Sequence, residues 1–501
     1  MEDKKIMKRR NNFVRTGGSL LASGLLTLVL AGCVGSADNS GATTAASTAA
    51  VLTPAAIAQR SADNYDENVN GLITGNTLKG WVDNWSANRP SGITGKLVIL
   101  QASTGEAGFE YVAPNGSDVF SYAVGSSEWV ETRSNGVTET VSMVPSGRTM
   151  DTFLSKYGIN PTQDMIVCAQ GTAGAGQMMR AGRCWYMLRY WGTAKEHLAI
   201  LNGGNQWVGT NTAMTAGDFA AAGSTPPLDG TTSVIDLPEA NMALQATLED
   251  MLNIVPAQDV NLAGDGVFIW DARGNNLPAS LPTSSGDEYS PDDDTDYRNG
   301  GATQGHPNGA LMLSYINLLD PAAGYTFKTK AEIQSYLDGN VDGAGVGFVD
   351  GTLQGVGAGN GYQTGDTVYT YCETTFRAMI TGVATGVILG LPTRFYDGAM
   401  TEWHSMANVV ASDGNAILPW DSPWRTDKSG VSMYRVQGTA SSISPRSIVD
   451  AYAPSADAVT VADLEYKGVI ISGPTSGTST GTSSGSGSSG GATLPPNPCG
   501  G

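Results

Sequence analysis

The stretch Val368-Tyr-Thr-Tyr-Cys372-Glu-Thr-Thr-Phe-Arg377 decides how the rest of the chain is interpreted. Its first part is rich in β-branched and aromatic residues and is typical of a buried strand. Residues 378–390 are mostly small and apolar and predict a helix. Cys372 therefore lies in a loop before a helix N-terminus, where backbone N–H groups stabilise an anion. This position lowers the pKa of a thiol, and Arg377 adds a permanent positive charge, so Cys372 is the candidate nucleophile.

The composition limits the architecture and the partners. A chain of 501 residues is too long for one ordinary core, so two or three domains are expected. The formal net charge of −19 disfavours nucleic acid as a partner. The chain has five cysteines, which is too few for a disulfide framework, and their spacing is not that of a zinc finger.

The N-terminus has the composition of an export signal followed by an anchor. A basic segment precedes an apolar stretch, residues 20–30, that is too short to span a bilayer. The stretch ends in Leu30-Ala-Gly-Cys33, which resembles the lipobox of bacterial lipoproteins. The resemblance implies removal of residues 1–32, lipidation of Cys33 and attachment to a membrane through lipid chains. By the sorting rule of that class, Val34 implies the outer membrane, on its periplasmic or extracellular face.

Two parts of the chain repeat one pattern. Pro114-Asn-Gly116 and Pro307-Asn-Gly309 are each followed by Ser-Tyr at the same spacing. Similar strands, residues 97–102 and 267–272, precede them. Strands that alternate with helices at this pitch predict a parallel sheet with helices on both faces. We therefore expect an α/β protein made by tandem duplication of one domain.

The second copy resembles the two-domain rhodanese (thiosulfate sulfurtransferase) family in four ordered motifs. The resemblance covers roughly residues 80 to 410 and implies a rhodanese-like fold for both copies. The four motifs are Asp271-Ala-Arg273, Gly305-His306-Pro-Asn-Gly-Ala310, Tyr371-Cys372-Glu373-Thr374-Thr375-Phe376-Arg377-Ala378 and Tyr396-Asp-Gly-Ala-Met-Thr-Glu-Trp403.

The resemblance and the composition together give the expected organisation. The segments are a signal peptide (1–32), a flexible tether (33–55), an N-terminal rhodanese-like domain (56–215), a linker (216–239), a C-terminal rhodanese-like domain with Cys372 (240–410), an extension packed on the domains (411–472) and a disordered Gly/Ser/Thr tail (473–501). In the family the first domain is usually catalytically silent, and here Gln170 stands where the second copy has Cys372. Cys168 is expected to be a buried small apolar side chain, with a disulfide to Cys184 as the alternative.

The resemblance implies sulfur transfer at Cys372. The thiolate attacks the outer sulfur of a donor such as thiosulfate or mercaptopyruvate and becomes a persulfide, from which cyanide or a thiol takes the sulfur. No cofactor is needed, and the partners are a small anionic donor and a thiol acceptor. The implied roles are catalysis for Cys372, Arg377 and Arg273, persulfide stabilisation by the loop of Glu373, Thr374, Thr375 and Phe376, and structural support from Asp271 and His306.

Two loop residues depart from the family pattern. Thr375 replaces a glycine, which matters if that position needs positive φ. Glu373 places a carboxylate beside the thiol, which raises the thiol pKa and repels dianions. A second hypothesis therefore stays open: a non-enzymatic accessory lipoprotein of an outer-membrane redox, electron-transfer or oxyanion (selenite, tellurite) reduction complex.

One further segment has the spacing of a metal site. Asp338-Gly-Asn340-Val-Asp342-Gly matches the first half of a calcium loop, in which alternate oxygens face the cation. The twelfth position, which should be acidic, is Val349. A calcium site and a plain glycine-rich turn are the two interpretations, and no other metal site is expected.

Overall fold

The computed structural model describes residues 49–274, 289, 305–406, 416–432 and 446–469, and the backbone of two short strands between 297 and 303. All of these belong to one compact unit, Ala46–Gly501. The predictions on the signal peptide, on Cys33 and on the C-terminal tail fall outside the described residues. No helix within the described ranges combines the length and the apolar character needed to cross a membrane. We call residues 49–240 the first half and 241–406 the second half.

Each half contributes one five-stranded parallel sheet. In spatial order the first sheet consists of β2 (Gly71–Ile73), β9 (Leu198–Leu201), β8 (Met165–Ala169), β3 (Leu97–Gln101) and β5 (Val119–Ala123). The second consists of β12 (Gln245–Ala246), β20 (Thr393–Tyr396), β19 (Thr367–Tyr371), β13 (Val267–Asp271) and β16 (Leu311–Met312). Both sheets place their strands in the same order by sequence: first, fifth, fourth, second, third. The α/β class and the duplicated parallel sheet are confirmed.

The repeated turns have the same structural place in both halves. Each Pro-Asn-Gly turn directly precedes the third strand of its sheet, β5 or β16. Gly116 and Gly309 adopt φ of +75° and +80°, a region that glycine enters without steric cost. The glycines are therefore required by the turn geometry.

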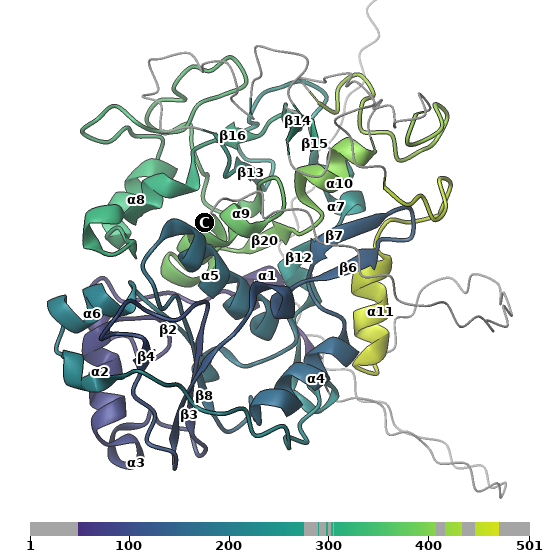
Figure 1. The fold of residues 1–501 in the computed structure, drawn as a ribbon. Helices are drawn as coiled ribbons and strands as arrows, with labels where there is room; N and C mark the ends of the chain where they lie inside the picture. The colour runs from purple at the N-terminus through teal and green to yellow at the C-terminus, as the bar shows by residue number, and fades with distance from the viewer. Residues whose placement is uncertain are drawn as a thin grey trace, which may run out of the picture. The chain divides into compact units, whose positions relative to one another are not determined.

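Helices cover both faces of each sheet (Figure 1). Because side chains alternate along a strand, Val98 and Leu100 of β3 face one core and Leu97 and Ile99 face another. The helices of the first half are α1 (Pro54–Ile57), α2 (Gly75–Asp83), α3 (Trp85–Asn88), α4 (Gly147–Tyr157), α5 (Ala175–Tyr190) and α6 (Asn205–Asn211). Those that follow are α7 (Leu248–Ile254), α8 (Lys330–Leu337), α9 (Phe376–Val383), α10 (Ala399–Ser405) and α11 (Ala458–Tyr466).

The layers follow from these helices. In the first half α4 and α5 cover one face and α2, α3 and α6 the other; in the second half α8 and α9 cover one face and α7 and α10 the other. Short two-stranded pairs complete the fold: β1 (Ala50–Val51) with β11 (Glu239–Ala240), β4 (Tyr111–Val112) with β10 (Phe219–Ala220), β6 (Glu131–Ser134) with β7 (Glu139–Met143), β14 (Tyr297–Arg298) with β15 (Ala302–Thr303), and β17 (Leu319–Asp320) with β18 (Thr326–Phe327).

The two halves share one core because α5 packs against α9 (Figure 1). The helices approach closely at Gly182, where an added Cβ would lie 2.8 Å from the Cβ of Met379. A fully buried ion pair joins Arg183 of α5 to Asp397 after β20. The halves are therefore packed as one body across this helix pair.

A disulfide fixes α5 to the first sheet. Cys168 of β8 is bonded to Cys184 of α5, and both residues are fully buried. The expectation that Cys168 is a plain buried side chain is wrong, and the alternative, the disulfide, is what the structure contains. The reason is the rotation of α5, which turns Cys184 toward β8 and which spacing in the sequence does not give.

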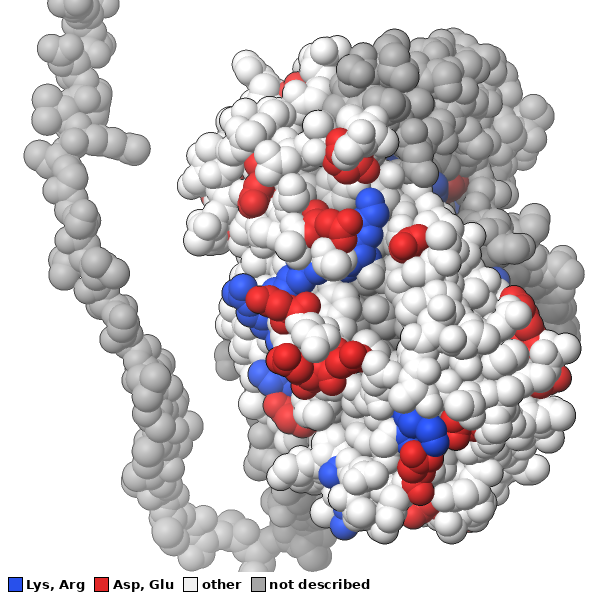
Figure 2. All heavy atoms as spheres, turned by 90° about the vertical axis from the view of Figure 1, so that its left-hand side faces the viewer, with Lys and Arg blue, Asp and Glu red and all other residues white. Residues whose placement is uncertain are grey.

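Charges are mixed on the surface. On the face in Figure 2, Lys and Arg lie beside Asp and Glu, and most of the described surface carries neither. The negative net charge is therefore not gathered into one acidic field on this face.

Candidate functional site

The site is built where two neighbouring strands end. β13 and β19 pair in parallel register, with Asp271 opposite Tyr371. The residues that follow them, Arg273 on one strand and Cys372 and Glu373 on the other, therefore leave the sheet side by side at its carboxyl edge. In open α/β sheets, ligands bind at this edge.

Cys372 is fully buried in the structure. It is a thiol, not half of a disulfide, and its exposed fraction is 0%. It packs with Ala272 and Ala378, and the partly buried Tyr315 lies against this cluster. Side chains therefore cover the thiol of the candidate nucleophile in this structure.

The carbonyl groups of the loop face α10. The backbone N–H groups of Met400 and Thr401 donate to the carbonyl oxygens of Cys372 and Glu373, each at 3.1 Å. Because a trans peptide unit points its N–H opposite to its C=O, the N–H groups of Glu373 and Thr374 are directed away from α10. The loop then runs into the N-terminus of α9 at Phe376, which carries partial positive charge.

Thr375 occupies the strained position of the loop. Its φ is +67°, in the left-handed region that is unfavourable for a β-branched residue. Its hydroxyl oxygen lies 3.0 Å from the carbonyl oxygen of Tyr396 and 2.8 Å from that of Asp397, and donates to them. These contacts hold the loop against the end of β20 and offset the strain.

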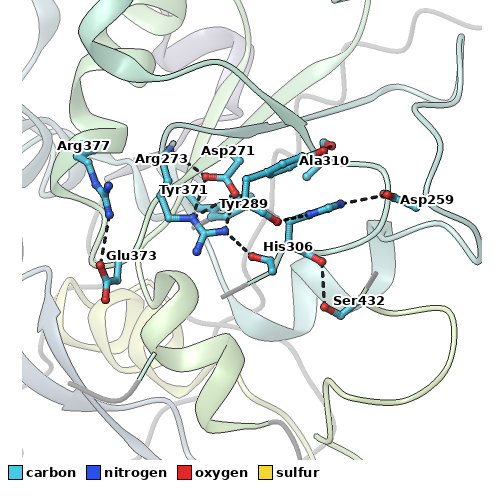
Figure 3. A network of polar contacts seen from close by, with 11 residues as sticks. Asp259, Asp271, Arg273, Tyr289, His306, Ala310, Tyr371, Glu373, Arg377 and Ser432 are labelled. Carbon is cyan, nitrogen blue, oxygen red and sulfur yellow. Dashed lines mark hydrogen bonds and ion pairs between the residues drawn. The ribbon is translucent and has the colours of Figure 1, made fainter. Parts of the chain in front are cut away.

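Glu373 is buried and interacts with two arginine side chains. Its side chain is 1% exposed, and Nη2 of Arg377 donates to its Oε2 at 3.3 Å (Figure 3). Arg446, from the C-terminal extension, also interacts electrostatically with this carboxylate, and burial lowers the pKa of Arg446 while Glu373 opposes that change. Arg446 Nε donates to Ser405 Oγ at 3.2 Å.

Arg273 is held by its own strand and by the turn beside it. Its Nη2 lies 2.6 Å from Oδ2 of Asp271 and donates to the carbonyl of Gly305 at 2.5 Å. Tyr371 donates to Asp271 at 2.8 Å, and burial raises the pKa of this tyrosine well above its usual value. The guanidinium lies over the Tyr371 ring, 5.7 Å from its centroid. Arg273 and Asp271 thus form a buried pair behind the loop (Figure 3).

His306 ties a buried turn to its surroundings. Its ring stacks on Tyr289 with centroids 3.8 Å apart, and Nδ1 lies 2.9 Å from the Tyr289 carbonyl oxygen. Nε2 lies 3.1 Å from Oδ2 of Asp259, and the His306 carbonyl accepts from Ser432 at 2.9 Å. These contacts, drawn in Figure 3, join the turn to Tyr289, Asp259 and Ser432, and the supporting role of His306 stays a prediction.

Two residues near the site were missed by sequence reasoning. His404 on α10 is 1% exposed, and burial together with Arg273 lowers its pKa well below its usual value, so the ring is neutral. Arg446, in the C-terminal extension, interacts electrostatically with Glu373. Neither residue has a motif or a spacing that would have marked it in the sequence.

The predicted calcium ligands make other contacts. Asp342 accepts from the Tyr336 hydroxyl at 2.8 Å and from two backbone N–H groups of its own turn. Asp338 accepts from the side chain of Gln334 at 2.9 Å. Within the described ranges, no three His, Cys, Asp or Glu side chains gather as metal ligands. The calcium site stays a prediction.

The equivalent loop of the first half carries no nucleophile. Gln101 and Ala169 are paired as Asp271 and Tyr371 are, so Gln170 occupies the place of Cys372. The Gln170 side chain accepts from the backbone N–H of Gly174 at 3.1 Å. The N–H of Gly174 in this loop is thus bound by the side-chain oxygen of Gln170.

Comparisons with known proteins give only weak likeness. No family model matches the chain, and no curated protein matches it. Among solved structures, the Tum1 protein from Saccharomyces cerevisiae is 17% identical, with 67% of this chain and 95% of that chain covered and a TM-score of 0.41. An anaerobic ergothioneine biosynthesis enzyme from Chlorobium limicola is 14% identical, with 67% and 68% covered and a TM-score of 0.42. A variant of EanB with a cysteine persulfide and ergothioneine is 13% identical, with 67% and 68% covered and a TM-score of 0.45.

The assignment of the chain to the two-domain rhodanese family is therefore corrected. Identities of 13–17% with TM-scores below 0.5, and no family match, do not place the chain in that family. The motifs that suggested it are short, and the loop departs from the pattern at Glu373 and Thr375. What the structure does share with the prediction is the fold class.

Proposed function

We propose that the protein transfers sulfane sulfur through a persulfide on Cys372. The observation that carries the proposal is the orientation of its loop. The carbonyl oxygens of Cys372 and Glu373 are bound by α10, so the following N–H groups face the other way, next to the start of α9. Amides and a helix N-terminus arranged in this way suit an anion on sulfur.

The transfer proceeds in two balanced steps. The Cys372 thiolate attacks the outer sulfur of a donor, forming an S–S bond; with thiosulfate the leaving group is sulfite, and with mercaptopyruvate it is pyruvate after protonation. A thiolate or cyanide then attacks the outer sulfur of the persulfide and releases the Cys372 thiolate. The loop amides stabilise the anion in both states, and Arg377 supplies fixed positive charge nearby.

Donor access requires a local movement, because Cys372 is fully buried. Tyr315, which follows β16, packs against the cysteine cluster and is itself partly exposed. We propose that Tyr315 moves aside to admit the donor.

The burial of Cys372 also favours a second candidate function, a non-enzymatic accessory. In this case the thiol is a core residue and the loop a binding surface without turnover. We further propose that a lipid on Cys33 holds the protein at the bacterial outer membrane, where it would associate with a redox or oxyanion-reducing complex. The support for this location is the N-terminal sequence.

One experiment separates the two functions. The purified protein is incubated with thiosulfate, mercaptopyruvate or polysulfide, and the persulfide is located by intact-mass and peptide mass spectrometry. Transfer predicts one added sulfur on Cys372, release of thiocyanate with cyanide, and loss of both in Cys372→Ser. Cys499→Ser is the matched control, since it removes a thiol from the C-terminal tail, and it should react as the wild type does. If no donor adds sulfur to Cys372, the enzyme proposal is wrong and the accessory role is supported.

A further inference from the structure

The loop that follows Cys372 contains a buried carboxylate, that of Glu373. Glu373, the residue after the cysteine, has a side chain that is 1% exposed and paired with Arg377. The Arg377 side chain is itself only 12% exposed. Arg446 interacts with the same carboxylate from the opposite element, the C-terminal extension. Arg377 is thus bound to this internal carboxylate, and Arg446 acts on it electrostatically.

This arrangement decides which charge the site can accept. An arginine pair beside a nucleophilic sulfur would attract a dianionic donor, because guanidinium groups bind oxyanions through charge-assisted hydrogen bonds. Here the internal carboxylate already accepts a hydrogen bond from Arg377. A dianion that entered would bring two further negative charges next to Glu373, in surroundings where little water screens the repulsion.

The alternative is that Glu373 only stabilises the fold. A buried ion pair of this kind contributes little net stability, because the cost of desolvating the charges offsets most of the attraction. The position of the carboxylate, adjacent in sequence to the cysteine and covered by residues from α9 and the extension, relates it to the sulfur site rather than to a distant part of the core.

We propose that Glu373 is a built-in counter-anion that makes the site select sulfur donors of low charge and reject dianions such as thiosulfate. The proposal rests on sulfur transfer through Cys372 and specifies its donor class: organic hydropersulfides without a carboxylate or sulfonate. In the first step the Cys372 thiolate attacks the terminal sulfur of the hydropersulfide. The S–S bond of the donor breaks, its thiolate leaves, and the transferred sulfur keeps its proton or gives it to that thiolate.

The test separates binding from chemistry. Thiosulfate is titrated calorimetrically into Cys372→Ser and into the double variant that also carries Glu373→Gln. Removing one like charge at a buried site should strengthen thiosulfate binding by about tenfold or more. Glu332→Gln, which changes an exposed carboxylate on α8, should leave it unchanged.

A kinetic arm uses the intact thiol. Persulfide formation on Cys372 is followed by intact mass with thiosulfate and with 2-hydroxyethyl hydropersulfide. The wild type should prefer the hydropersulfide, and Glu373→Gln should shift the preference toward thiosulfate. Equal thiosulfate affinity with and without the Glu373 charge overturns the inference whether or not sulfur is transferred. If Glu373→Gln does not fold, a wild type that reacts as fast with thiosulfate as with the hydropersulfide overturns it. The absence of persulfide with every donor, together with the predicted binding change, would instead refute the proposed function alone.

Discussion

A single threonine shows how the loop is held. Thr375 is β-branched and has positive φ, a combination that costs on the order of 1–3 kcal/mol and persists only where other contacts enforce it. Its hydroxyl bridges the carbonyl groups of Tyr396 and Asp397. One O–H shared between two acceptors fixes the loop to β20, so the side chain that creates the strain also supplies the contact that offsets it.

Removing this hydroxyl should weaken the protein. Thr375→Ala keeps the strained backbone but loses the hydrogen bond, so we expect the free energy of unfolding to fall by about 1–3 kcal/mol. Thr375→Ser keeps the donor and should lose less than half as much. Urea denaturation followed by tryptophan fluorescence measures both. An alanine variant as stable as the serine variant would show that the hydroxyl contacts contribute nothing.

At this scale, part of the site could be predicted from the sequence. The strand-to-loop position of Cys372 could be inferred from residue types, because a strand depends on local chemistry. A positive φ at residue 375 was suggested only by the glycine of the motif that the loop resembles, since a threonine disfavours that region. The electrostatic interaction between Arg446 and Glu373 could not be inferred, since it depends on how the extension returns to α10. The burial of Cys372 could not either, because it depends on which side chains lie above the loop.

The helix pair α5–α9 is the element on which the two halves meet. The sequence predicted a helix over residues 378–390; the structure begins it at Phe376, ends the α-helical part at Val383 and continues as a π-helix over Ala384–Ile388. The composition indicated a helix but not the wider turn at its end. The sequence could not decide between a plain buried Cys168 and its disulfide to Cys184 for the same reason, because helix rotation is set by tertiary packing.

Close packing at this crossing should be sensitive to one methyl group. Gly182→Ala would place a Cβ 2.8 Å from the Cβ of Met379, so the helices must separate, and we expect a loss of about 1–3 kcal/mol in the free energy of unfolding.

Gly80 on α2 is the matched control for this substitution. An added Cβ there meets nothing within 4 Å. Gly80→Ala should stabilise the protein by about 0.5–1 kcal/mol through helix propensity. Thermal unfolding of the two variants gives the comparison, and a neutral Gly182→Ala would mean that α5 and α9 are less tightly packed than the structure indicates.

At the scale of the whole molecule, polar groups buried between the halves fix their arrangement. Asn135, in the β6–β7 turn of the first half, donates to Glu402 of α10 at 2.7 Å, and Thr140 contacts the same carboxylate at 3.4 Å. Burial, with a smaller contribution from nearby Asp397, raises the pKa of Glu402 to about 7. The repeat that predicted two α/β copies contains no information on this interface.

The stability of the protein should therefore depend on pH through Glu402. Its carboxyl binds a proton more strongly when folded, so stability should fall as pH rises from about 4.5 to about 7 and level off above that. The slope from this group is at most about 1.4 kcal/mol per pH unit. Glu402→Gln should remove this part of the slope, whereas Glu67→Gln, at an exposed carboxylate, should not. Denaturation midpoints measured between about pH 5 and 8 give the slope of stability against pH. An unchanged slope in Glu402→Gln would contradict the prediction.

The C-terminal helix α11 belongs, by its contacts, to the first half. Asp463 binds Arg133 at 2.7 Å, and Lys467 donates to three carbonyl groups of the first half, those of Trp191, Val234 and Leu237. Synthesis runs from the other end, so the part of the protein made earliest stays incomplete until almost the last described residue has left the ribosome. For all that interval the nascent first half carries an unneutralised arginine and uncapped carbonyl groups, and a chain cut short before α11 would be left in that condition.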